Sequence, residues 1–336
     1  MKKTVSALLI IAAFFVLAAG TALAAESDLN QKMVISFLPK SVGGAWFTRM
    51  FEGVSQYGAE TGSEVFQIGP SVGDAAAQNR NVQDVVAQGV DVIAVTPFSP
   101  EQIDADLKKA KDAGIVVITN EGVFMDESIH YDIEPFDSKL FGENVADLYA
   151  NSMGGKGEII FFVGSLASTA HVSWTNGIVD AMKAKYPDLK VANAGGVYIE
   201  TGNNAANSYE KAKEALKTYP NATGVWCPSS TDTPSIARAI EEAGLVEKIT
   251  YAAVGLPNAT RTYINNGSID YLTSWDPAEL GIAMCKAAAA VKSGREIKDG
   301  DDLGVFGFSK LILSGKVIQG NEWRVVTAAD ADKYNY

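Results

Sequence analysis

Apolar positions follow two alternating patterns along most of the chain. Short, nearly continuous apolar runs predict buried strands at residues 33–37, 64–68, 92–96, 116–119, 158–163, 190–194, 224–227, 249–254 and 270–274. Between them, apolar residues recur at three- and four-residue spacing, which predicts helices at 46–61, 75–88, 100–113, 139–151, 177–186, 205–219, 234–243, 259–265 and 278–293. Strands that alternate with amphipathic helices predict an α/β protein built from βα units around parallel sheets.

The alternation breaks down near the end of the chain. Glycines separate two short apolar runs at 305–308 and 310–313 within the segment 300–320. This pattern predicts a late pair of strands or a return across a hinge, and not another βα unit.

The first residues have the pattern of an export signal. Lys2 and Lys3 precede an apolar run, and Ala22-Leu23-Ala24 forms an A-x-A site that predicts cleavage before Ala25. A membrane anchor is the alternative, but the uninterrupted apolar core of about 15 residues is shorter than the roughly 20 that a spanning helix needs. We therefore expect residues 1–24 to be a signal peptide and the mature protein to be free in the periplasm.

Length, charge and cysteine count narrow the class of protein. The chain has 336 residues, and at about 150 residues per domain its mature part predicts two lobes. A formal net charge of -12 disfavours nucleic acid and anionic lipid as partners. The two cysteines, Cys227 and Cys285, are too few for a disulfide framework, and both lie in apolar surroundings. Two buried free thiols are favoured, and a single bridge is the alternative.

Candidate binding residues follow the predicted strands. Ligands of parallel α/β sheets gather beyond the carboxyl ends of the strands, so the residues just after each strand are the candidates for binding. The candidate ligand-binding residues are Lys40, Trp46, Phe47, Asn120, Glu121, His171, Trp174, Pro228, Ser230, Asp232, Trp275 and Asp276. Aromatic faces together with hydroxyls, amides and carboxylates suit a small polyol. Each residue alone could equally be a core side chain or part of a solvated turn.

The motifs of common enzyme classes are missing from the sequence. The loop between the first strand and helix contains only the pair Gly43-Gly44, whereas a dinucleotide-binding site needs G-x-G-x-x-G. There is no P-loop, H-E-x-x-H or G-x-S-x-G motif, and His130 and His171 are the only histidines. We therefore expect no catalytic residues, no cofactor and no metal site.

Four motifs carry a resemblance to a known family. They are Phe37-Leu38-Pro39-Lys40 with Gly44-Ala45-Trp46-Phe47, the run Gln88 to Val95, Gly255-Leu256-Pro257-Asn258, and Trp275-Asp276-Pro277-Ala278-Glu279-Leu280-Gly281. On these residues the chain resembles the periplasmic sugar-binding proteins of ABC transporters, with a type I fold. Within that group it is similar to the rhamnose-binding and autoinducer-2-binding receptors.

The resemblance implies an architecture. It comprises two doubly wound parallel-sheet lobes, joined by three crossover strands near 131–135, 274–276 and 303–306, with the ligand held in the cleft between the lobes. The N-terminal lobe would comprise 25–133 and 276–305, and the C-terminal lobe 134–275 and 306–336. Cys285 and Cys227 would then lie in different lobes, which strengthens the expectation of free thiols.

The resemblance also implies partners. They are a carbohydrate ligand and an ABC permease, with a chemoreceptor or other membrane sensor as the alternative to the permease. The protein is expected to be a monomer. Sugar-responsive repressors share the fold, but they carry a DNA-binding helix-turn-helix, whereas this chain begins with an export signal and is acidic.

Individual positions match the family's binding residues. Lys40 matches the first-loop lysine of the autoinducer-2 receptors, Trp46 and Phe47 match aromatics that stack on sugars, and Glu121 takes the place of a carboxylate that is usually Asp. Pro228 and Ser230 match a contact loop, and Trp275 and Asp276 match contact residues of the second hinge.

Other positions depart from the family pattern. Ala170 and His171 replace the Asp-Gln pair of autoinducer-2 receptors, and Trp174 replaces the clamping Arg of ribose receptors. Leu256-Pro257 replaces an Asp that ribose receptors use. These changes favour a deoxysugar or another less polar polyol.

Overall fold

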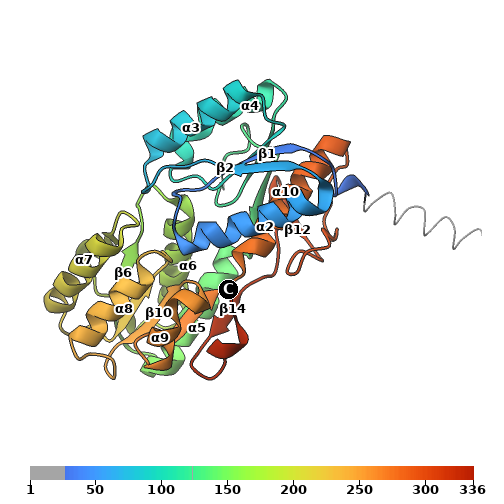
Figure 1. The fold of residues 1–336 in the computed structure, drawn as a ribbon. Helices are drawn as coiled ribbons and strands as arrows, with labels where there is room; N and C mark the ends of the chain where they lie inside the picture. Colours follow the sequence, from blue (N-terminus) through green and yellow to red (C-terminus); the bar gives the residue numbers. More distant parts are fainter. Residues whose placement is uncertain (1–26, 123) are drawn as a thin grey trace, which may run out of the picture.

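The computed structural model describes residues 27–122 and 124–336, so the predicted signal peptide lies outside the described residues. The chain forms two α/β lobes, each built on its own twisted sheet (Figure 1). The strand order is β12-β13-β5-β4-β3-β1-β2 in the first lobe and β14-β11-β10-β9-β6-β7 in the second, where β8 also pairs with β6. All pairings are parallel except β12 with β13 and β11 with β14. The predicted α/β class with two lobes is therefore confirmed.

The first lobe packs helices on both faces of its sheet. Its strands are β1 (Val34–Leu38), β2 (Glu64–Gln67), β3 (Val92–Val95), β4 (Val116–Thr119), β5 (Tyr131–Glu134), β12 (Ile312–Ser314) and β13 (Val317–Gln319). Its helices are α2 (Ala45–Thr61), α3 (Ala75–Gln88), α4 (Pro100–Asp112) and α10 (Pro277–Ser293). Side chains alternate along each strand, so Val92 packs into the core beneath α2 and α10, while Ile93 packs beneath α3 and α4.

The second lobe repeats this arrangement. Its strands are β6 (Gly157–Val163), β7 (Leu189–Val191), β8 (Ile199–Glu200), β9 (Gly224–Cys227), β10 (Thr250–Val254), β11 (Tyr271–Ser274) and β14 (Arg324–Val326). Its helices are α5 (Ser138–Met153), α6 (Thr169–Lys185), α7 (Ala205–Thr218), α8 (Thr233–Glu242) and α9 (Pro257–Asn265), with short 3₁₀ turns η1 (Ala194–Gly196) and η2 (Ala331–Lys333). The core beneath α5 and α6 is continuous with the core beneath α2 and α10, so apolar packing crosses between the lobes.

The chain passes between the lobes three times. The first two crossings, from β5 to α5 and from β11 to α10, lie where the sequence predicted them. The third lies between β13 and β14, and not near 303–306, because β12 and β13 add to the first sheet beside β5. The expected assignment of 306–336 to the second lobe is therefore wrong for 312–319. The run 305–308 forms a turn and not a strand.

One residue links the three crossings by hydrogen bonds. Glu322, on the third crossing, is buried; its backbone N–H donates to the carbonyl of Pro135 on the first, at 2.9 Å. Its carboxyl Oε1 accepts a bond from the backbone N–H of Asp276 on the second, also at 2.9 Å. The three crossings are therefore held together at one buried residue, through its backbone N–H and its carboxyl group.

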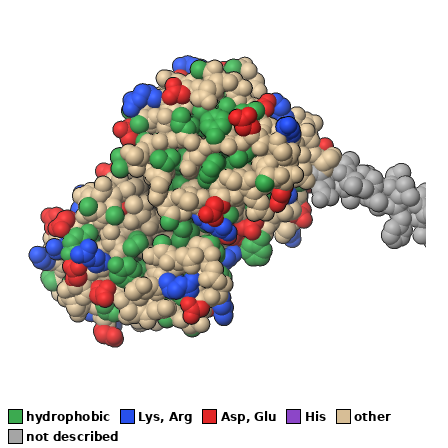
Figure 2. All heavy atoms as spheres, in the orientation of Figure 1, with side chains coloured by type: hydrophobic (Ala, Val, Ile, Leu, Met, Phe, Trp, Pro, Cys, Tyr) green, Lys and Arg blue, Asp and Glu red, His purple; other side chains and the backbone are tan. Residues whose placement is uncertain are grey.

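Both cysteines are buried and unpaired, Cys227 on β9 and Cys285 on α10, as the sequence predicted. Among residues 27–122 and 124–336, no helix combines the length and apolarity needed to cross a bilayer. Acidic and basic side chains are interspersed over both lobes on the face shown in Figure 2.

Candidate ligand-binding site

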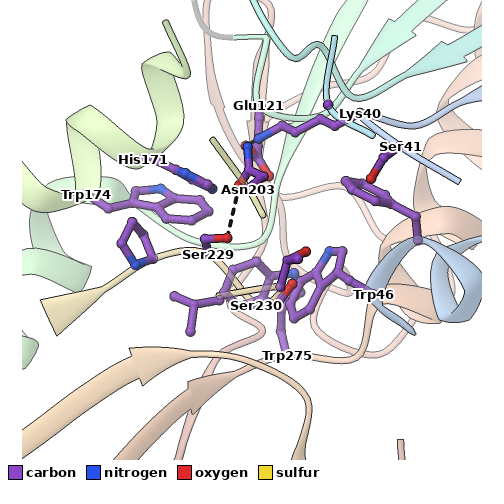
Figure 3. Close-up of a pocket in the computed structure, with 15 residues that line it drawn as sticks. Lys40, Ser41, Trp46, Glu121, His171, Trp174, Asn203, Ser229, Ser230 and Trp275 are labelled. Carbon is purple, nitrogen blue, oxygen red and sulfur yellow. Dashed lines mark hydrogen bonds and ion pairs between the residues drawn. The ribbon is translucent and has the colours of Figure 1, made fainter. Parts of the chain in front are cut away.

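A pocket lies between the two lobes at the carboxyl ends of their strands (Figure 3). Its free volume is about 30 Å³, room for about two water molecules, so its lining residues lie close together across the cleft. The lining residues are Lys40, Ser41, Trp46, Phe47, Gly73, Glu121, His171, Trp174, Asn203, Pro228, Ser229, Ser230, Thr231, Val254 and Trp275. The structure therefore brings together most of the candidate residues, which lie far apart in the sequence.

Three tryptophans form one wall of the pocket and join the lobes. Trp46 comes from α2 in the first lobe, Trp174 from α6 in the second, and Trp275 follows β11 at the second crossing. The ring of Trp275 meets Trp46 edge to face at 4.8 Å between centroids and Trp174 at 5.7 Å. All three are buried, and the Nε1–H groups of Trp174 and Trp275 have no partner among the described residues. Buried donors of this kind require an acceptor, and a ligand oxygen would provide one.

An ion pair lies on the opposite side of the pocket. Lys40 Nζ, from the loop after β1, donates to a carboxylate oxygen of Glu121, from the loop after β4. The two residues are 5% and 7% exposed, so the pair is almost fully removed from solvent. Lys40 Nζ also lies 3.3 Å from Ser168 Oγ of the second lobe. The pair is electrically balanced and makes a polar contact across the cleft.

His171 contributes a neutral imidazole. The sequence predicts a helix that begins at residue 177, but α6 already begins at Thr169, so His171 and Trp174 lie on its first turns. Ser168 occupies the N-cap without capping the helix, and its hydroxyl accepts the bond from Lys40 instead. Burial, and then the charge of Lys40, hold the pKa of His171 well below its usual value. Nδ1 accepts the backbone N–H of Gly164 at 3.2 Å, which leaves Nε2–H as a donor.

Asn203 and Ser229 line the pocket but were not among the candidates. Ser229 Oγ donates to Asn203 Oδ1 at 3.0 Å, and Asn203 Nδ2 is buried without a partner among the described residues (Figure 3). Asn203 follows β8, a strand of only two residues whose pattern is too short to detect. Ser229 lies between two predicted residues, so the rule that selected Pro228 and Ser230 could have included it.

Three candidate residues do not reach the pocket. Asn120 is buried, and its amide donates to the Ile133 carbonyl at 3.0 Å. Asp232 is buried and accepts a bond from Thr201 at 2.5 Å, and burial raises its pKa to about 6. Asp276 caps α10 by accepting the Ala278 N–H and forms a two-bond ion pair with Arg49 at 2.7 and 2.9 Å. Each of these side chains already forms hydrogen bonds or an ion pair with other residues of the fold.

The structure thus has two lobes with a pocket between them. The family model described as "Periplasmic binding protein domain" matches residues 35–296. The chain belongs to this family, which confirms the resemblance drawn from the motifs.

Curated relatives carry the names of sugar- and polyol-binding proteins. The xylitol-binding protein of Mycolicibacterium smegmatis is 25% identical over 227 residues, which cover 67% of this chain and 63% of that protein. The D-allose-binding periplasmic protein of Escherichia coli is 23% identical over 273 residues, which cover 77% of this chain and 84% of that protein.

Solved structures share the whole fold. LsrB from Clostridium saccharobutylicum, in complex with AI-2, has a TM-score of 0.83 at 21% identity, covering 90% of this chain and 100% of that one. A solute-binding protein of Clostridium phytofermentas with bound L-rhamnose has a TM-score of 0.81 at 19% identity, covering 90% and 98%. At these identities the likeness establishes the type I two-lobed fold.

Proposed function

We propose that this protein is a periplasmic receptor that captures a small neutral sugar or polyol between its lobes and delivers it to an ABC permease. The observation that carries the proposal is the composition of the pocket: a wall of three tryptophans faces a balanced ion pair and a neutral histidine. Aromatic faces cover the C–H surface of a sugar, and donors with no other partner bind its oxygens. The names of the relatives, which bind xylitol and D-allose, support the same class.

The balance of charge in the pocket argues for a neutral ligand. Lys40 is paired with Glu121, and His171 is uncharged, so the lining offers no free ionic partner to a phosphate or a sugar acid. An anion placed here would have to compete with Glu121 for Lys40 in a site almost closed to water, which is unfavourable. Trp174 Nε1, Trp275 Nε1 and Asn203 Nδ2 instead offer neutral donors to hydroxyl or ring oxygens.

Binding would act through closure of the lobes. Ligand contacts to both lobes favour the closed form by their differential affinity for it, and no chemical step is required. The closed protein then presents both lobes to the permease. The exported location rests on the N-terminal pattern of residues 1–24, and the chain would act as a monomer.

A ligand panel tests the proposal. The purified mature protein is heated with L-rhamnose, D-allose, D-ribose, xylitol, autoinducer-2 and, as an anionic comparison, D-gluconate. A ligand at 100 times its Kd adds about 2.7 kcal/mol of stability, which raises Tm by several degrees. We expect a shift with a neutral polyol and none with gluconate.

Two variants locate the site. Trp174→Ala should abolish the shift, because it removes one of the three tryptophans that form the wall of the pocket. Trp226→Phe is the matched control: Trp226 is also fully buried, but it lies in the core of the second lobe and bonds Thr175 at 3.0 Å. It should lower Tm and leave the ligand-induced shift intact. No shift with any neutral polyol, or equal shifts in both variants, would contradict the proposal.

A further inference from the structure

Two buried carboxyl groups lie directly behind the Glu121 side of the pocket. Asp132 and Glu134 stand two residues apart on β5, so their side chains project from the same face of the strand. Their exposed fractions are 0% and 3%. Neither lines the pocket, and nothing in the binding of a ligand by itself requires them. Buried acidic groups are costly unless they serve as partners, so their hydrogen bonds indicate what they do.

The bonds of both carboxyl groups converge on the loop that carries Glu121. Glu134 Oε1 accepts the backbone N–H of Glu121 at 2.7 Å. Asp132 Oδ1 accepts the backbone N–H of Gly122 at 2.8 Å and the hydroxyl of Thr119 at 2.6 Å. Two consecutive amides of the loop are therefore held by two side chains of one strand.

The loop needs this support because of its backbone conformation. Glu121 has φ of 61°, in the left-handed region that a residue with a side chain rarely adopts. Such a conformation persists only where the surroundings hold it. In it, the Glu121 side chain meets Lys40, and Lys40 reaches Ser168 on the other lobe at 3.3 Å. A continuous chain of contacts thus runs from β5, where the chain first leaves the first lobe, to the far side of the cleft.

The electrostatics of Asp132 and Glu134 agree with a role in holding the loop that carries Glu121. Three carboxyl groups, Glu121, Asp132 and Glu134, lie near one cation, Lys40. Burial raises the pKa of Asp132, and burial together with the charges of Asp132 and Glu121 raises the pKa of Glu134 well above its usual value. A raised pKa favours the neutral form of these carboxyl groups, which competes less with Glu121 for Lys40.

We propose that Asp132 and Glu134 are positioning residues of the ligand site, which fix the backbone of Glu121 and Gly122 and thereby the Lys40–Glu121 pair. The inference rests on the proposed function, in which this pair contacts a neutral polyol. It assigns to β5 a role in ligand affinity in addition to its role as a crossing strand.

A pair of variants at one position separates hydrogen bonding from packing. Glu134→Gln keeps an oxygen acceptor for the Glu121 amide, whereas Glu134→Met keeps the shape and removes the acceptor. Amide hydrogen exchange of the ligand-free protein, measured by NMR at Glu121 and Gly122, gives a readout that needs no ligand. We expect exchange at Glu121 to become at least tenfold faster in Glu134→Met and to stay within threefold of the parent in Glu134→Gln.

Ligand affinity is the second readout. The Kd is measured for whichever of L-rhamnose, D-allose or xylitol stabilises the parent. Glu134→Met should raise the Kd at least tenfold, whereas Glu134→Gln should keep the Kd within threefold of the parent value. Asp270→Leu is the matched control, because Asp270 also accepts a backbone N–H, that of Tyr251 at 2.8 Å, but lies in the second lobe away from the pocket. Asp270→Leu should leave amide exchange at Glu121 and Gly122 unchanged, and it should also leave the Kd unchanged.

A milder variant keeps the test decisive if Glu134→Met does not fold. Thr119→Val is nearly isosteric and removes one of the two donors that hold Asp132, so exchange at Gly122 and the Kd should each rise at least threefold. Unchanged exchange at these amides in Glu134→Met, or in Thr119→Val where that is the folded variant, would overturn the positioning role whatever the ligand. Faster exchange in a protein that binds no polyol would support positioning of the loop and overturn the proposed ligand class.

Discussion

The buried Lys40–Glu121 ion pair should make the protein strongly sensitive to the loss of either charge. Lys40→Met removes the cation and leaves a carboxylate in a site that is 7% exposed. Breaking a buried ion pair from one side typically costs about 3–5 kcal/mol. We therefore expect Lys40→Met to lower the free energy of unfolding by about 3–5 kcal/mol at pH 7.

The double-mutant cycle shows whether this loss belongs to the pair. Glu121→Gln alone strands the lysine and should also cost about 3 kcal/mol, whereas Lys40→Met with Glu121→Gln leaves no buried charge. The double variant should therefore be less destabilised than the two single losses added together, by about 2 kcal/mol or more. Urea unfolding at pH 7, followed by tryptophan fluorescence, measures each free energy.

A second cycle on an exposed pair is the control. Lys108 and Asp112 form an i,i+4 ion pair at 3.0 Å on α4, with side chains 47% and 64% exposed. Such pairs are worth about 0.3–0.5 kcal/mol, so the same cycle should give a coupling within that range. If the losses at Lys40 and Glu121 add to within about 0.5 kcal/mol, the two groups do not interact in the folded protein, and the buried ion pair of the pocket does not form.

Three further outcomes follow from buried groups elsewhere in the fold. Burial raises the pKa of Glu322 to about 8, so the folded state keeps a proton that the unfolded chain releases near pH 4–5, and stability falls as pH rises from 5 to 8. Glu322→Gln should remove about 3–4 kcal/mol of this pH dependence in urea unfolding at pH 5 and 8, and an unchanged dependence would contradict it. Gly53→Ala places a methyl group against the backbone carbonyl of Ala278, where α2 meets α10, so it should lower Tm by several degrees, and an unchanged Tm would refute this close approach. Burial raises the pKa of both thiols, Cys227 and Cys285, so Ellman's reagent should label neither in the native protein and both in urea; rapid native labelling would show that they are accessible.

Periodicity predicted the fold where elements are long or fully buried. The bounds of α3, β4 and β9 are the predicted ones, because each is delimited by a clear change between apolar and polar positions. The predicted start of α6 is eight residues too late. The first turns of this helix carry hydroxyl side chains together with His171 and Trp174, which face the pocket, so apolar residues do not recur there at helical spacing. The placement of β12 and β13 could not be predicted, because strand order depends on tertiary contacts that a local pattern does not contain.

The candidate site was predictable because of where parallel strands end. Lys40, Glu121 and Trp275 each follow a strand, and the topology brings all three strand ends to one cleft. The same rule also selected Asp276, whose carboxylate is engaged by Arg49 and the start of α10. A position after a strand therefore identifies residues near the cleft, but it does not distinguish a side chain that faces the ligand from one that holds the backbone.

The division of the pocket between the lobes constrains how binding can act. Lys40, Trp46 and Glu121 belong to the first lobe, while His171, Trp174 and Asn203 belong to the second. A ligand that touched only one group would bind the open and closed forms equally well and could not change their populations. A polyol that stacks on the tryptophans and bonds donors of both lobes gains most of its contacts only when the lobes meet. Trp275, on the second crossing, touches both Trp46 and Trp174, so under the proposed function its ring would take part in both closure and ligand contact.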